Sequence, residues 1–308
     1  MAEDLIRLGT LNKDAVILAA DQRGFLKAEN IRMEMNIVTD SPTLLRNLIG
    51  GRTDLIVNNA DNVIAWAEGQ GADPNPNDFV IFLGGSQGLR QKLVVLSSVN
   101  DFCDLKGKVL AVDAPTTGFA IVMIYILKQR GLELNRDYTF KAFGNTPKRA
   151  EALSRGEAWG GMMNLPEDEI QARGFKVLAR SEDYVTHYAR GLGATRREWA
   201  NANEELLVRF IRAFVRATDW VTDGKNKEDV IELLLPENNN SKLRAEEAYE
   251  ESVSPRFGFT PRSRIDLEGI RAILELRRTA GLMKPPLPKP EKYVDDRFYK
   301  KAVAGLAG

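Results

Sequence analysis

The sequence has very little of the chemistry on which most enzymes and metal sites depend. Its 308 residues include one cysteine, Cys103, and one histidine, His187. A single cysteine excludes an internal disulfide and a thiolate metal cluster. General acid–base catalysis near neutral pH relies most often on histidine, and a metal site needs several suitable ligands close together. The composition therefore favours a protein that is not an enzyme and holds no cofactor or metal, although carboxylates alone leave catalysis open.

An excess of charge and a long apolar run are also missing. Lys plus Arg and Asp plus Glu both number 43, so no broad field favours nucleic acid or an anionic membrane. No apolar run approaches the roughly 20 residues that span a bilayer. The N-terminus, MAEDLIRLG, has neither the basic nor the apolar region of a secretory signal. The expected partner is a small molecule.

Strands and helices alternate from Leu5 to about Arg180, which predicts parallel sheets with helices on both faces. After about Thr195 the pattern changes to helices alone. The longest, Glu204–Val221, places an apolar stripe along one face that must cover a sheet. The last segment is rich in proline and charge, and it is expected to run over the surface before a short terminal helix.

One segment reads as a complete strand–loop–helix unit, Asp104–Leu132, with the sequence DLKGKVLAVDAPTTGFAIVMIYILKQRGL. Val109–Val112 is the expected strand, and Thr116 or Thr117 can cap the helix that ends at Gly131. A helix that starts at the carboxyl end of a strand has free backbone N–H groups, which bind polar or anionic groups. This loop is therefore a candidate binding loop.

This unit, with three further segments in the same order, resembles a known family. The others are AADQRGFLKAENIRMEM at Ala19–Met35, GGRTDLIVNNADNVIAWAEG at Gly50–Gly69, and Leu153–Gly174. Together they resemble ABC-transporter substrate-binding proteins of the nitrate/sulfonate/taurine and thiamine-pyrimidine (NMT1/THI5-like) type. None of the segments names a ligand.

The resemblance implies an α/β fold of two lobes, the type II periplasmic binding protein or "Venus flytrap". Lobe 1 would hold residues 1–92 plus 190–308, including the C-terminal helices, and lobe 2 would hold residues 93–189. The two crossings are expected near residues 91–96 and 188–195. At the second crossing, ARGLGAT supplies Gly191 and Gly193, which can absorb a hinge rotation or simply end a strand. His187 lies just before this crossing and is interpreted as a hinge or surface residue.

Ligands of open α/β sheets bind beyond the carboxyl ends of the strands, and four polar loops occupy that position here. They are Thr10–Lys13, Asn58–Asn62, Asp113–Gly118 and Met163–Glu167. The same residue types are common in helix caps and turns. The loops are therefore interpreted as ligand-binding because all four lie at the same end of the expected sheets. The expected ligand contacts are Asn12, Lys13, Asn58, Asn59, Asp61, Arg90, Asp113, Thr116, Thr117 and Asn164.

Three functions fit a bilobal fold. By resemblance, an enzyme of this fold acting on an aromatic or pyrimidine-like metabolite is the alternative, but the fungal enzyme of this group depends on cysteines and histidine that the chain lacks. A transcription regulator would carry an N-terminal helix-turn-helix, whereas this chain begins with a strand. By the resemblance, the chain is interpreted as a monomeric receptor, periplasmic or extracytoplasmic with its signal peptide removed, which delivers a carboxylate, sulfonate or pyrimidine-like molecule to an ABC permease.

Overall fold

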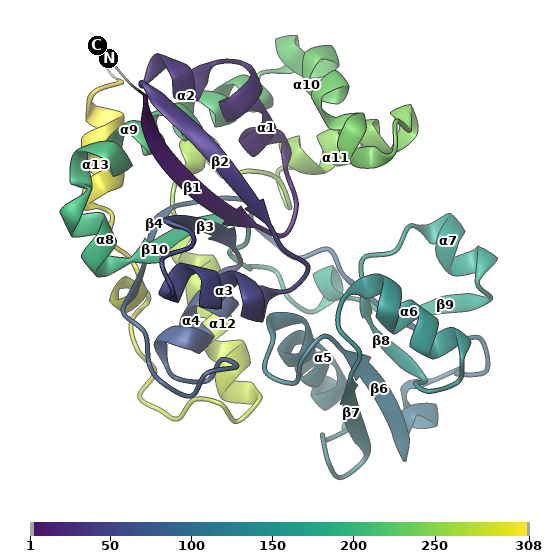
Figure 1. The fold of residues 1–308 in the computed structure, drawn as a ribbon. Helices are drawn as coiled ribbons and strands as arrows, with labels where there is room; N and C mark the ends of the chain where they lie inside the picture. Colours follow the sequence, from purple (N-terminus) through teal and green to yellow (C-terminus); the bar gives the residue numbers. More distant parts are fainter. Residues whose placement is uncertain (1–2, 307–308) are drawn as a thin grey trace. The chain divides into compact units, whose positions relative to one another are not determined.

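The computed structural model describes residues 3–306, which divide into two compact units (Figure 1). Unit 1 comprises the residues up to 87, 189–270, and those from 289 onward; unit 2 comprises residues 88–188 and 271–288. The first boundary lies slightly before the expected crossing at 91–96. Residues 271–288, which we expected in lobe 1, belong to unit 2, where the Thr279 carbonyl accepts a hydrogen bond from Lys128 Nζ at 3.3 Å.

Unit 1 is built on a five-stranded sheet with the order β2-β1-β3-β10-β4. β1 pairs in parallel with β2 and β3, whereas β10 lies antiparallel between β3 and β4. The sheet is therefore mixed and not wholly parallel, because the chain returns from unit 2 in the opposite direction. The strands are β1 (Asp4–Thr10), β2 (Ile31–Ile37), β3 (Leu55–Asn58), β4 (Phe79–Leu83) and β10 (Leu192–Arg196).

The apolar stripe expected after Glu204 forms the centre of the core of unit 1. It lies on α9 (Glu204–Thr222), which packs against α1, α2 and α13. Phe210 stacks on Phe214 with ring centroids 4.3 Å apart and meets Phe82 of β4 edge-on at 6.3 Å. The other helices are α1 (Ala15–Gln22), α2 (Phe25–Ala28), α3 (Ser41–Ile49), α4 (Ala60–Ala67), α8 (Arg197–Ala202), α10 (Lys227–Leu234), α11 (Lys242–Val253) and α13 (Arg297–Ala304).

A buried carboxylate ties α2 to α9. Glu29, which follows α2 and is 8% exposed, accepts hydrogen bonds from Arg212 (2.9 and 3.1 Å) and Arg216 (3.2 Å). Its backbone carbonyl accepts another from Arg209 at 2.7 Å. Three arginines on one face of α9 therefore converge on one residue.

Unit 2 contains a second five-stranded mixed sheet with the order β7-β6-β8-β5-β9, in which β5 runs antiparallel to β8 and β9. Its strands are β5 (Lys92–Leu96), β6 (Lys108–Val112), β7 (Tyr138–Ala142), β8 (Gly160–Met163) and β9 (Phe175–Arg180). Its helices are α5 (Gly118–Gln129), α6 (Thr146–Ser154), α7 (Glu167–Ala172) and most of α12 (Leu267–Thr279). Within the described residues, no helix combines the length and apolar character of a membrane span.

Candidate functional site

The carboxyl edge of the sheet in unit 1 gathers three loops. β1, β3 and β4 end there, and they are followed by the loop 11–14, the Asn58–Asn59 junction and the pair Gly84–Gly85. The antiparallel strand β10 begins at the same edge, just after Gly191. This is the position in which an open α/β sheet binds its ligands.

Two predicted contacts, Asn12 and Lys13, lie in the first of these loops. Asn12 is exposed, and its carbonyl accepts a hydrogen bond from Thr10 Oγ1 at 2.7 Å. Lys13 Nζ forms an ion pair with Glu237 Oε1 at 2.8 Å. The Lys13 charge is therefore already matched within unit 1.

Three more predicted contacts, Asn58, Asn59 and Asp61, surround the start of α4. Asn58 is 4% exposed, and its Oδ1 accepts from Asn59 N at 2.8 Å and from Asn62 Nδ2 at 3.1 Å. Within residues 3–306 its buried Nδ2 has no hydrogen-bond partner. Asn59 is the N-cap of α4, but its side-chain oxygen accepts from Gly191 N at 3.2 Å. Asp61 is buried in the first turn. Asn58 thus presents an unused donor at this edge.

In unit 2 the predicted loop Asp113–Gly118 lies at the equivalent edge, between β6 and α5. Thr117 is the N-cap of α5, yet its hydroxyl donates to Asp113 Oδ1 at 2.5 Å and to the Ala114 carbonyl at 2.9 Å. In the described chain no side chain caps α5, so no side-chain acceptor takes up the first backbone N–H groups of this helix. Thr116 is half-buried beside it.

The same edge of unit 2 holds the last two predicted contacts, Arg90 and Asn164. Both are exposed; Arg90 precedes β5 and Asn164 follows β8. Sequence reasoning missed Lys92, the buried first residue of β5, whose Nζ donates to the Leu165 carbonyl at 2.8 Å. Burial lowers the pKa of Lys92, and the nearby Glu167 opposes that shift. The sequence signal that could have identified Lys92 is a lysine at the first position of an otherwise apolar strand.

Arg149 of α6 was also missed. It is 2% exposed and donates to the Gly144 carbonyl at 2.5 Å and to Thr146 Oγ1 at 3.0 Å, which ties the loop after β7 to its helix. Burial lowers the pKa of Arg149, and the negative charge of Asp113 counteracts this. A positive charge therefore lies close to the α5 loop.

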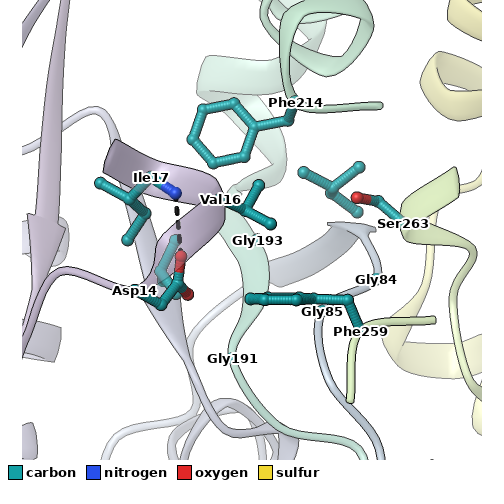
Figure 2. A pocket seen from close by; sticks show the side chains of 12 residues that line it. Asp14, Val16, Ile17, Gly84, Gly85, Gly191, Gly193, Phe214, Phe259 and Ser263 are labelled. Atoms are coloured by element: carbon teal, nitrogen blue, oxygen red, sulfur yellow. Dashed lines mark hydrogen bonds between the residues drawn. The ribbon is translucent and has the colours of Figure 1, made fainter. Parts of the chain in front are cut away.

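A small cavity lies at the edge of the sheet in unit 1, next to the start of α1 (Figure 2). Its volume is about 10 Å³, close to the space that one water molecule needs, so an organic ligand does not fit inside it. The lining includes Asp14, Phe214, Phe259 and the glycines Gly84, Gly85, Gly191 and Gly193.

Two of these glycines allow backbones to touch. A Cβ on Gly85 would lie 2.0 Å from the Gly191 carbonyl oxygen, and one on Gly84 would lie 2.0 Å from that of Arg264. No side chain fits at such distances, because real Cβ contacts are well beyond 3 Å. These positions therefore require glycine for close packing.

Asp14 is the charged residue of the cavity lining. It caps α1 by accepting a hydrogen bond from Ile17 N at 2.8 Å. Burial raises the pKa of Asp14 to about 6, and the positive charge of Arg190 acts in the opposite direction. The folded state thus favours the protonated carboxyl more than the unfolded chain does.

We expect the Asp14→Asn variant to gain stability relative to wild type as the pH rises. The stability that the raised pKa contributes is present below about pH 4, the unfolded pKa, and is lost as the pH rises through about 6. Asparagine caps helices equally well and does not titrate. Between pH 4 and 7 the difference in unfolding free energy should shift by about 1–2 kcal/mol, reduced by the partial exposure of Asp14. Urea denaturation at several pH values measures this, and parallel pH profiles would contradict it.

No catalytic residue was predicted from the sequence, and its single cysteine and histidine, Cys103 and His187, both lie at the surface. Across the described part of the chain, no group of three or more His, Cys, Asp and Glu side chains is placed to hold a metal ion. The polar side chains at the two strand-end edges form hydrogen bonds and ion pairs.

Comparison with protein families identifies one match. A family described as "ABC transporter, phosphonate, periplasmic substrate-binding protein" matches residues 26–207, more than half of the chain. No curated protein matches the sequence.

Solved structures share the fold at low sequence identity. The nitrate-binding protein NrtA of Synechocystis PCC 6803 is 12% identical, with a TM-score of 0.77 over 99% of this chain and 89% of that one. The alkanesulfonate-binding protein SsuA of Xanthomonas axonopodis pv. citri, solved with MOPS bound, is 18% identical, with a TM-score of 0.70 over 95% and 99%. The desulfurization enzyme DSZB is 15% identical, with a TM-score of 0.64 over 99% and 100%.

Proposed function

Because the chain belongs to the phosphonate-binding family of periplasmic substrate-binding proteins of ABC transporters, we propose that it captures one small organic anion. It is a solute-binding receptor of ABC-type import, and the family implies a small-molecule ligand, a permease partner and an extracytoplasmic location. We further propose that it acts as a monomer and binds no nucleic acid, since its positive and negative side chains both number 43.

The observation that carries the anion proposal is a pair of helix starts. α4 follows β3 in unit 1 and α5 follows β6 in unit 2, and in the described chain neither helix has a side-chain cap. Free N–H groups at a helix start attract negatively charged oxygens. At α4 the N–H groups of Ala60 and Asn62 already donate to the Ala189 and Asn59 carbonyls, so the start of α5 contributes more to this preference. A phosphonate, sulfonate or carboxylate would use them better than a pyrimidine-like heterocycle, which carries no full charge. The donor Asn58 Nδ2 and the buried charge of Arg149 add to this preference.

An enzyme of the same fold is the alternative function, since the desulfurization enzyme DSZB has this fold. We propose that this chain is not an enzyme, because its one histidine and one cysteine are exposed and acid–base or nucleophilic catalysis usually needs activated side chains held together. Ligand recovered unchanged after long incubation supports a receptor, whereas recovery of a converted product would support an enzyme.

Titration calorimetry with methylphosphonate, ethanesulfonate, acetate and nitrate tests the proposal. We expect measurable heat of binding with at least one anion and none with a neutral analogue such as dimethyl sulfone. Native mass spectrometry of freshly purified protein should also detect any ligand that co-purifies. Binding of neutral molecules alone would refute the anion proposal.

We expect the Asn58→Asp variant to bind the preferred anion about 10- to 100-fold more weakly than wild type. The change keeps the Oδ1 acceptor for Asn59 and Asn62 and replaces the unused donor with an anionic oxygen. Calorimetry measures the affinity, and the exposed Asn240→Asp serves as the matched control. Wild-type affinity in both variants would remove Asn58 from the site.

A further inference from the structure

The two segments that connect unit 1 to residues 88–188 pair with each other where they leave unit 1. Ser86 N donates to the Arg190 carbonyl at 2.8 Å, and Arg190 N donates to the Ser86 carbonyl at 3.0 Å. The unit boundaries follow immediately, at 87/88 and 188/189. Any rotation of one unit against the other must therefore turn backbone dihedrals next to this pairing.

A third segment extends the pairing on the other side of Ser86. Gln87 N donates to the Gly258 carbonyl at 3.0 Å, and Thr260 N donates to the Gly85 carbonyl at 2.8 Å. We call this arrangement of residues 85–87, 190–191 and 258–260 the hinge ladder. Its third segment comes from the loop after α11, so the hinge ladder is fastened to the helical part of unit 1.

A charged side chain, that of Arg190, links the second connecting segment to the third. Arg190 Nη2 forms an ion pair with Glu251 Oε1 at 2.6 Å and also donates to the Phe257 carbonyl at 3.0 Å. The two side chains are 24% and 26% exposed. Such a charge-assisted pair, partly shielded from water, is stronger than a surface ion pair. Arg190 thus fastens the second connecting segment directly to the end of α11.

The packing beside the hinge ladder leaves room for movement. The cavity near Asp14 is lined by Gly84, Gly85, Gly191 and Phe259, which belong to or adjoin the hinge ladder (Figure 2). Protein interiors are otherwise close-packed, so a void lowers the cost of small shifts of these backbones. The contact between Gly85 and Gly191 holds the two segments close to each other, and the side chain of Arg190 adds an attachment to α11.

We propose that Arg190 is a positioning residue for ligand capture, an inference that rests on the proposed receptor function. Its contacts with Glu251 and Phe257 keep the second connecting segment in register with the first. At these two connections, rotation is thereby confined to the residues just beyond the hinge ladder. Without the guanidinium, the segment keeps its backbone hydrogen bonds and the one from Gly191 N to Asn59 but loses its attachment to α11, and the two units sample a wider range of separations.

Pulsed electron paramagnetic resonance tests this with one spin label in each unit. Cys103, the single cysteine, is exposed in unit 2, and Lys225→Cys supplies an exposed position in unit 1. Without ligand, Arg190→Met and Glu251→Gln should each widen the distance distribution about twofold, because the segment loses its attachment. Arg190→Lys keeps the charge and should restore most of the wild-type width.

The matched control is Arg197→Met, which removes ion pairs with Asp78 and Asp295, both in unit 1 and outside the hinge ladder. A purely structural role would lower the melting temperature without widening the distribution. Unchanged widths in folded Arg190→Met and Glu251→Gln, or equal widening in Arg197→Met, would overturn the proposal. If Arg190→Met fails to fold, the width of the distance distribution in Glu251→Gln tests the proposal. This measurement needs no ligand, so its failure is distinguishable from a failure of methylphosphonate or any other anion to bind.

Discussion

Replacing Gly85 with alanine should destabilise the protein by about 3–4 kcal/mol, near the upper end of single substitutions. The added Cβ would lie 2.0 Å from the Gly191 carbonyl oxygen, within the pair of connecting segments. The three nearest atoms all belong to the backbone of Arg190 and Gly191, so no rotamer change can relieve the contact. The segments must separate, and the hydrogen bonds between Ser86 and Arg190 are strained or lost. Urea denaturation of the two proteins at one pH measures the difference.

Gly224→Ala is the matched control for this prediction. Nothing lies within 4 Å of a Cβ at Gly224, and its φ is outside the left-handed region. We expect a change within about 0.5 kcal/mol, as for ordinary surface substitutions. If Gly85→Ala were as stable as wild type, the two connecting segments would lie farther apart than they do in the structure.

The second large effect is expected at Glu29. The Glu29→Gln variant should lose about 2–3 kcal/mol, because an uncharged amide replaces a buried carboxylate that two guanidinium groups of α9 contact. The value is below that for a fully buried network, since Arg212 and Arg216 are 26% and 43% exposed. Chemical denaturation measures the loss.

Glu250→Gln provides the comparison. Its ion pair with Lys227, at 2.9 Å, joins side chains that are 62% and 45% exposed. Exposed pairs contribute about 0–1 kcal/mol, so this variant should be close to wild type. Equal losses of unfolding free energy in both variants would show that burial does not determine how much Glu29 contributes to stability.

Periodicity predicted most of the fold, but not the direction of every strand. The stripe on Glu204–Val221 and the alternation up to Arg180 correspond to α9 and to the strands of both sheets. β10 was expected as part of a crossing, and it is a strand that runs antiparallel inside the first sheet. The direction of a strand depends on the edge at which the chain re-enters the sheet. The local residue pattern does not encode this edge.

The candidate site was predictable where it depends on loop position. Asn58, Asn59 and Thr117 lie at the strand ends, as the parallel arrangement requires. The sequence did not reveal the hydrogen bonds that their side chains form. Asn59 Oδ1 accepts a hydrogen bond from Gly191 N, and the Thr117 hydroxyl donates one to Asp113. Burial of Lys92 and Arg149 was equally hidden, because charged residues are mostly exposed. Whether these residues contact a ligand stays a prediction.

The division of the chain has a consequence for how the protein folds. Unit 2 draws most of its residues from one continuous stretch, 88–188, whereas unit 1 combines three stretches separated by unit 2. Contacts between distant parts of a chain form slowly, because closing long loops costs entropy. During synthesis the sheet of unit 2 can form first, while α1 still lacks α9, the later helix against which it packs. Unfinished chains would therefore expose the apolar surface of unit 1 until their last residues arrive.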